Sequence, residues 1–111
     1  MTPEQSELVD RLRAALSTAP VTKEVSMFGG RSFMVAGKLA VCALKNGGLL
    51  VRVDADRHDE FLALPGAVQA HMGADRTMGP GWIEVSAAAL DGPGLDTWVG
   101  RALQYNRTVT D

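Results

Sequence analysis

The first part of the chain has apolar residues at the spacing of one helix face. Thr2 precedes Pro3, and Gln5 lies three residues after Thr2. Thr is a favoured N-cap residue, Pro suits the first helical turn, and Gln at this distance can complete a capping box. The apolar residues that follow recur at helical spacing: Leu8, Val9, Leu12, Ala15 and Leu16. The pattern predicts an amphipathic helix that ends within residues 17–20.

The pattern then changes to extended segments separated by turn residues. Residues 27–35 are predicted to be extended, with a bulge or sharp turn at Gly29 and Gly30. After a short turn at residues 36–38, the apolar run 39–44 predicts a second strand.

A hairpin signal follows this second strand. Residues 45–48 contain an Asn-Gly pair, which is typical of a tight turn between antiparallel strands. The third strand is predicted at residues 49–53. Its odd positions are expected to face the core, and its even positions, Leu50 and Arg52, the opposite face.

The second half of the chain predicts a short helix and two more strands. Asp56 is expected to cap a helix over residues 57–63, which the Leu-Pro-Gly sequence at 64–66 ends. Strands are predicted at residues 69–72 and 81–85.

A terminal amphipathic helix follows the turn residues at 91–94. Its apolar stripe consists of Leu95, Trp98, Val99, Ala102 and Leu103. The predicted order is α-β(3)-α-β(2)-α, an α+β fold in which helices pack on an antiparallel sheet.

Composition sets the domain count and narrows the function classes. With 111 residues, 46% hydrophobic and 22% charged, the chain is expected to form a single domain over residues 1–111. The net charge of -2 and the absence of a basic run make nucleic-acid binding an unfavoured class. One cysteine, no apolar leader and no run long enough to span a bilayer favour a cytoplasmic protein without membrane contact.

The acidic segment before the short helix is not expected to bind a metal. Asp54, Asp56, His58 and Asp59 lack the spacing of a calcium loop, and a capped, solvated helix start explains them. His71 has no second ligand at zinc spacing.

No catalytic residue or cofactor is predicted. Cys42 lies within an apolar strand, where a thiol is expected to be buried and unreactive. Ser32 lacks the Gly-x-Ser-x-Gly sequence of a nucleophile elbow. The open alternative is a small acid-base site assembled from Arg52, His58, Asp59 and Glu84.

The glycine-rich segment 29–32 has two interpretations. It lacks the ending of a P-loop, so a structural turn is favoured over an anion or partner contact. The tryptophans and several methionines are expected to fill the core: Trp82, Trp98, Met27, Met34, Met72 and Met78.

Several motifs follow one another in a recognisable order from about residue 10 to 107. They are Met27-Phe28-Gly29-Gly30, Phe33, Gly37-Lys38, Leu49-Leu50-Val51-Arg52, Leu64-Pro65-Gly66-Ala67, Gly81-Trp82 and a closing helix that contains Trp98. Their order and spacing resemble the TfoX/Sxy N-terminal domain family. The resemblance implies the same α-β(3)-α-β(2)-α fold. It also implies no catalytic residues that could be assigned to positions in this chain.

The resemblance implies a role in regulation. The family takes its name from regulators of natural competence, which act with a transcription activator and carry a second, C-terminal domain. Because this chain ends at Asp111, we expect a stand-alone regulatory or protein-interaction module.

The expected partner is an unidentified protein that contacts the sheet or the segment 29–33. The candidate contact residues are Gly29, Gly30, Arg31 and Arg52, since arginine binds carboxylates bidentately and is frequent in interface hot spots. The alternative is direct nucleic-acid binding by Arg31, Lys38, Lys45 and Arg52 on one face. A homodimer is also predicted, from open strand edges and from apolar residues such as Leu50 on the second face.

Overall fold

The structure, a computed structural model, describes residues 2–27, 30–71 and 76–110, apart from the side chain of Thr22. Helices and strands follow one another in the order α1 (Pro3–Ala15), β1 (Val21–Met27), β2 (Gly30–Val35), β3 (Lys38–Leu44), β4 (Leu49–Arg52), α2 (His58–Leu62), β5 (Ala67–Gln69), β6 (Trp82–Val85) and α3 (Gly94–Thr110). Short 3-10 turns at Ala55–Arg57 and Ala87–Leu90 precede α2 and α3. Within the described ranges, no helix combines the length and the apolar character needed to cross a membrane.

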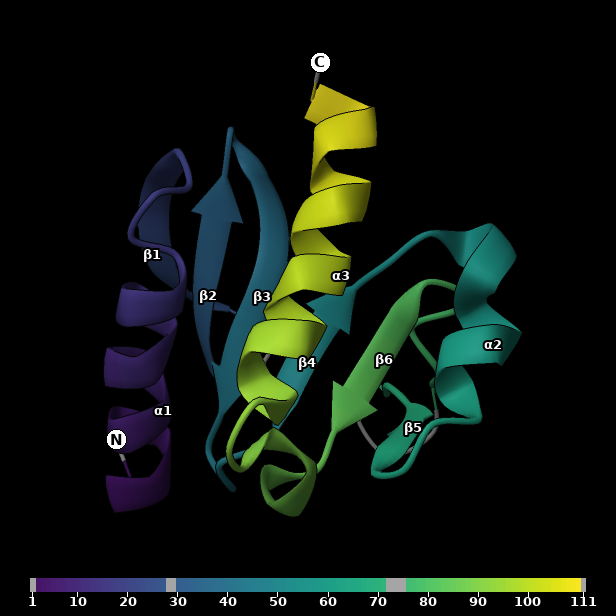
Figure 1. Ribbon diagram of the computed structural model, residues 1–111, viewed down its shortest axis with the longest axis horizontal. Coiled ribbons are helices and arrows are strands. Elements are labelled where there is room, and N and C mark those ends of the chain that lie inside the picture. The colour runs from purple at the N-terminus through teal and green to yellow at the C-terminus, as the bar shows by residue number, and fades with distance from the viewer. Residues whose placement is uncertain (1, 28–29, 72–75, 111) are drawn as a thin grey trace.

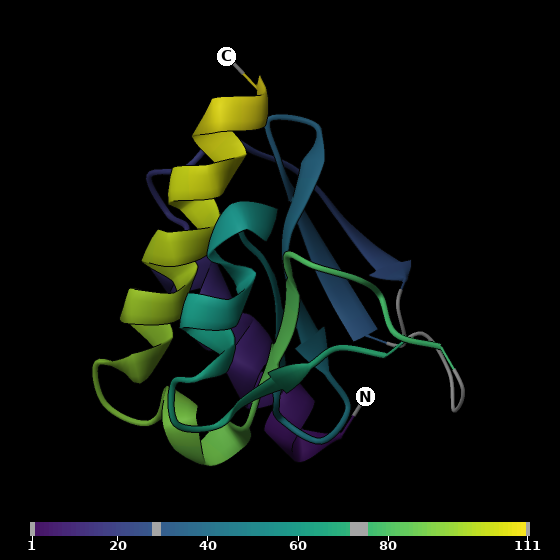
Figure 2. The ribbon, with the colours of Figure 1, turned by 90° about the vertical axis from the view of Figure 1, so that its right-hand side faces the viewer.

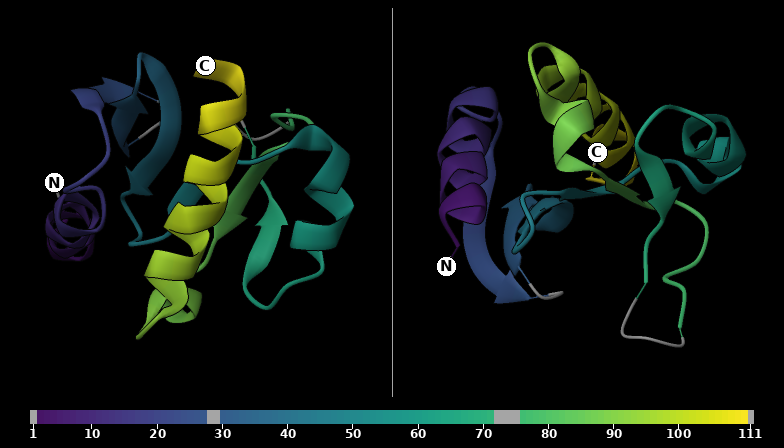
Figure 3. Two further views of the ribbon diagram at one scale, coloured as in Figure 1. Left: turned by 45° about the horizontal axis from the view of Figure 1, so that its top comes forward. Right: turned by 90° about the horizontal axis from the view of Figure 1, so that it is seen from below.

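The strands form one six-stranded sheet in the order β1-β2-β3-β4-β6-β5, and every neighbouring pair is antiparallel. The helices lie on one side of this sheet, and the described parts of the connection between β5 and β6 project to the other (Figures 1 and 3). The predicted α+β class is confirmed. The structure adds one strand, because residues 21–27 pair with β2 as the first arm of a hairpin. This edge strand is rich in polar residues, so its apolar residues did not indicate a strand clearly.

Helix α1 begins as predicted but uses Gln5 differently. The Thr2 hydroxyl accepts a hydrogen bond from the Gln5 backbone N–H at 3.1 Å. The predicted return bond of a capping box is wrong. The Gln5 side chain is buried and its Nε2 donates to the Ala43 carbonyl oxygen at 2.9 Å. The amide therefore ties α1 to β3 and satisfies a polar group inside the core.

The main core lies between the sheet and helices α1 and α3. It includes the odd positions of β4 and the stripe of α3, as predicted, and Trp98 is buried in it. Leu50 faces the other side, also as predicted, but it is not exposed. It forms a second, small cluster with Cys42 and Ala70, against which Met78 and Trp82 pack.

Other expectations require correction. Asp54, not Asp56, caps the turn before α2, since its carboxylate accepts a hydrogen bond from the Asp56 backbone N–H at 2.9 Å. Strand β5 begins at Ala67, earlier than predicted, because it pairs with β6 directly after the Pro-Gly turn. Met27 is 39% exposed on the edge strand and is not core filler. Met72 lies outside the described residues.

Gly30 offers a test of how closely β2 and β3 approach. A Cβ at this position would lie within 2.2 Å of the Ala43 carbonyl oxygen, so Gly30→Ala must push the strands apart. We expect it to lower the free energy of unfolding by about 1–3 kcal/mol in urea denaturation. The control is Gly100→Ala on α3, where an added Cβ meets nothing within 4 Å. This variant is expected to gain about 0.5–1 kcal/mol, and equal stability of the two variants would contradict the packing argument.

Candidate functional site

Arginine and aromatic side chains meet where α2, α3 and the end of β4 come together. Helices α2 and α3 are neighbours on the same side of the sheet (Figure 2). We call this set the arginine-aromatic cluster, and it consists of Arg52, Arg57, Phe61, Trp82, Trp98, Arg101 and Tyr105.

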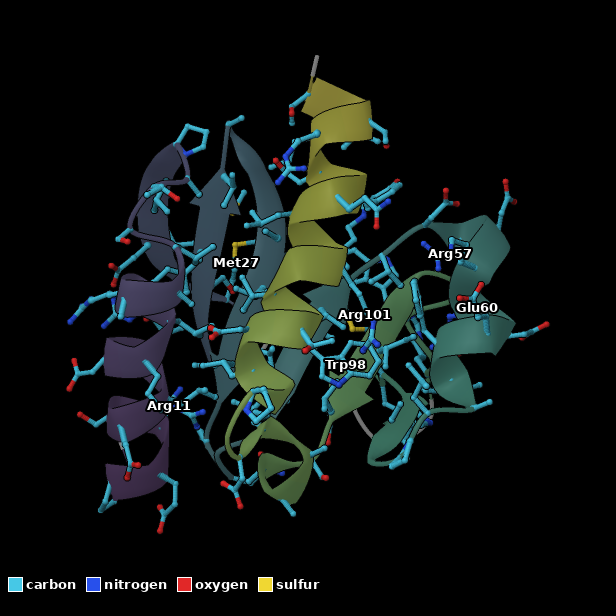
Figure 4. The ribbon with its side chains drawn as sticks, in the orientation of Figure 1. Arg11, Met27, Arg57, Glu60, Trp98 and Arg101 are labelled. Atoms are coloured by element: carbon cyan, nitrogen blue, oxygen red, sulfur yellow. The ribbon has the colours of Figure 1, made fainter. Side chains whose placement is uncertain are left out.

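The guanidinium of Arg101 stacks on two aromatic rings. Its Cζ is 4.5 Å from the ring centroid of Trp98 and 5.5 Å from that of Phe61 (Figure 4). The two rings are buried and meet edge to face, with centroids 6.2 Å apart. Stacking of this kind fixes the guanidinium plane and leaves its N–H donors at the edge. Among the described residues, no carboxylate forms a salt bridge with Arg101, although its charge helps the hydrogen bond from Arg57 to lower the pKa of Glu60.

Arg57 already has a carboxylate partner on its own helix turn. Its Nη2 is 2.7 Å from Glu60 Oε2 and its Nε donates to Glu60 Oε1 at 3.2 Å. This bidentate hydrogen bond lowers the pKa of Glu60 and keeps the carboxylate ionised. Arg57 also stacks on Phe61, with its Cζ 4.4 Å from the ring centroid. Both charged side chains are largely exposed, so the pair orients Arg57 more than it stabilises the fold.

Arg52 ends β4 and lies between two further rings. It pairs with Trp82 of β6, and its Cζ is 4.7 Å from the Trp82 ring centroid and 5.8 Å from that of Tyr105. The side chain is therefore half-buried and stacked rather than freely solvated. Tyr105 joins this arginine to the α2–α3 side of the cluster.

A cavity of about 130 Å³ opens between α2 and α3. Guanidinium, carboxylate, amide, phenol and hydroxyl groups line it together with one buried ring. These side chains belong to Asp54, Arg57, Phe61, Arg101, Gln104, Tyr105 and Thr108.

The residues predicted to contact a partner do not converge. Arg31 aligns across β3 with Leu49, at the start of β4, whereas Arg52 is at its end. Gly29 lies outside the described residues. Gly30 is the first residue of β2 and is required by the close approach of β3, whereas the predicted turn at residues 29 and 30 lies partly outside the described residues. The buried Nε of Arg31 has no hydrogen-bond acceptor among the described residues.

The residues of the alternative acid-base site have separate surroundings. His58 is buried, and its Nδ1 accepts a hydrogen bond from the Gly81 backbone N–H at 2.9 Å. Asp59 is exposed, and Glu84 pairs with Leu50 of β4. None of these three lines the cavity between α2 and α3. In the described part of the chain, no group of three potential ligands could hold a metal ion.

Cys42 and Ser32 are fully buried, as expected for the thiol. Ser32 Oγ donates to the Met27 carbonyl oxygen at 3.1 Å. Burial raises the pKa of the Cys42 thiol, which disfavours the reactive thiolate.

Sequence reasoning missed Arg57, Arg101 and Tyr105. A signal was present in the helical spacing, because positions 98, 101 and 105 share one side of α3. The contact of this side with α2 depends on tertiary packing, which the spacing does not reveal.

Comparison with known proteins identifies a family. The model of the TfoX N-terminal domain matches residues 14–105. Neither a curated protein nor a solved structure matches the chain significantly.

The burial of Cys42 predicts slow thiol chemistry. Ellman's reagent should label the folded protein slowly at pH 8 and react to completion once guanidinium chloride unfolds it, because the thiol is buried and its pKa is raised. The rate of thionitrobenzoate release measures this. Equally fast labelling in both states would contradict the buried position.

Proposed function

Because the chain belongs to the TfoX N-terminal domain family, we propose that it is a non-enzymatic regulatory or protein-interaction module linked to transcriptional regulation. The family is not a known enzyme family, and it supplies no catalytic residues to assign here. For an interaction module, the question is which surface contacts the partner.

The stacking of Arg52 carries this proposal. Trp82 and Tyr105 hold its guanidinium, and no described residue supplies an acceptor for its N–H groups. Arginine, tryptophan and tyrosine are the residue types enriched in interface hot spots. A held guanidinium loses little conformational entropy when it binds a carboxylate bidentately. We therefore propose an acidic surface of another protein as the partner of Arg52.

The segment that begins at Gly30 is the second proposed contact. Arg31 is half-buried; its Nε is buried and has no acceptor in the described part of the chain, so only the exposed part of the side chain is available to a partner. Since Arg31 lies far along the sheet from Arg52, one partner would contact both only across a broad surface.

Nucleic-acid binding is the less favoured alternative. Lys38 opens β3 and Lys45 directly follows it, so the two lysines lie at opposite ends of one strand. With Arg31 and Arg52 they form no continuous basic track. The net charge of -2 also opposes the binding of phosphate backbones.

We also propose a homodimer, and the open edges of the sheet now support it in place of Leu50. Leu50 is buried and cannot support it, but β1 and β5 are open edges of the sheet. Apolar side chains are exposed at both edges, including Met27 on β1 and Val68 on β5. Unpaired strand edges can pair with another copy of the same chain.

The interaction proposal predicts that Arg52→Met loses its partner. Tagged wild type, Arg52→Met and Arg107→Met would be used to capture partners from native lysate. Arg107 is exposed on α3 and belongs to no part of the cluster, so it controls for loss of one charge. We expect recovery of a specific protein to fall about tenfold for Arg52→Met alone, which corresponds to about 1.4 kcal/mol.

A salt titration against duplex DNA separates the two classes of partner. The outcome that contradicts the proposal is no captured protein together with submicromolar DNA binding that weakens steeply with salt. Weak DNA binding that is the same for wild type and Arg52→Met is expected instead.

The dimer proposal predicts a species of twice 11.8 kDa in sedimentation velocity at micromolar concentration. Charge introduced on the edge strand by Met27→Lys should shift the protein toward monomer, because like charges would face each other. A single monomeric species for the wild type would disprove the dimer.

A further inference from the structure

We propose that the cavity between α2 and α3 binds a carboxylate group, with Arg101 as its main ligand. The inference rests on the proposed function for the source of that group, an acidic side chain of the protein partner. The binding chemistry itself is argued from the cavity alone.

The donors of the cavity lie along one side of α3. Gln104 and Tyr105 follow Arg101 by three and four residues, and Thr108 follows Tyr105 by three, so these side chains line one side of the helix. Thr108 Oγ1 donates to the Tyr105 carbonyl oxygen at 2.7 Å, which uses the proton of this hydroxyl. The guanidinium, the Gln104 amide and the Tyr105 phenol remain as possible donors to one oxyanion.

Arg101 is oriented before any ligand arrives. The buried rings of Trp98 and Phe61 hold its guanidinium. Other arginines use acceptors within the chain: Arg11 donates to the Leu90 carbonyl oxygen, and Arg13 pairs with Glu24. Arg101 has no such acceptor among the described residues, although its donors border a cavity. An oriented but unpaired guanidinium is the group that a carboxylate binds with two parallel hydrogen bonds.

The local charge favours a monoanion. Three guanidinium groups, of Arg52, Arg57 and Arg101, are close to two carboxylates, of Asp54 and Glu60. Their sum is one positive charge. A carboxylate neutralises it, whereas a phosphate dianion would leave excess negative charge beside Asp54.

The size of the cavity favours a small group over a whole cofactor. Pockets for cofactors and drug-sized molecules usually have about 300–1,000 Å³. A volume of about 130 Å³ fits a carboxylate with a short aliphatic chain. An Asp or Glu side chain has these dimensions, and a nucleotide does not.

The test is an NMR titration of the isolated, ¹⁵N-labelled protein. The probe is blocked glutamate, N-acetylglutamate N-methylamide, and its neutral isostere is the corresponding glutamine derivative. We expect the amide signals of α3 around Arg101 to shift with a Kd of about 1–10 mM for the glutamate probe, a strength typical of so small a ligand. The glutamine probe should produce no saturating shift.

Variants connect the binding to Arg101. Arg101→Met keeps an apolar side chain against the rings of Trp98 and Phe61 but removes the guanidinium, and it should weaken binding about tenfold or more. Arg101→Lys keeps the charge but loses the planar donor pair, so an intermediate loss is expected, and it replaces the Met variant if that one unfolds. Arg107→Met should bind like wild type. Unchanged binding by the folded Arg101 variants would overturn the assignment.

Two further probes identify the chemistry and its source. Inorganic phosphate should bind more weakly than blocked glutamate, and tighter phosphate binding would overturn the carboxylate assignment. Succinate should not exceed blocked glutamate, and tighter succinate binding would overturn the side-chain source in favour of a small-molecule acid.

The titration does not depend on partner capture, so the two proposals can fail separately. Probe binding without any captured partner supports the cavity and counts against the interaction module. A partner lost in Arg52→Met, with no probe binding to wild type, supports the module and overturns the cavity assignment.

Discussion

The burial of one stripe of α3 against the sheet determines where the polar residues of this helix lie. Leu95, Trp98, Val99 and Ala102 enter the main core, and farther along Asn106 Nδ2 donates to the Val35 carbonyl oxygen at 3.0 Å. These contacts set the rotation of the helix about its axis. Arg101 and Tyr105 flank this buried stripe, so they lie beside α2, where the arginine-aromatic cluster forms.

Features set by neighbouring residues could be predicted from the sequence, and features set by distant contacts could not. The hairpin turn at residues 45–48 follows from its Asn-Gly pair, and Gly47 has a φ of 83°, which suits glycine. The alternation along β4 and the stripe of α3 follow from apolar spacing. Gln5 formed its bond with Ala43 instead of its own helix end, because tertiary packing provided a buried acceptor. The candidate cavity needed α2 and α3, far apart in sequence, to be brought together.

Residues at and near the connection between β5 and β6 cover part of the sheet face that lies away from the helices. Cys42 and Leu50 are buried there under Ala70, Met78 and Trp82, which flank the connection between β5 and β6. Trp82 takes part in this cover and in the stacking of Arg52, so it joins the second cluster to the arginine-aromatic cluster. A substitution that moves Trp82 within the second cluster would therefore also move the guanidinium of Arg52.

The sheet order has a consequence for synthesis on the ribosome. Strands β1 to β4 are joined by successive hairpins and can pair as soon as they emerge. Strand β6 pairs with β4 from much later in the chain, and α3 follows all six strands. During translation, the apolar side of β3 and β4 is not covered by α3 until this helix has been synthesised. Between the synthesis of β4 and that of α3, the nascent chain therefore exposes part of an apolar sheet face, and this is the stage at which chaperone contact would be most useful.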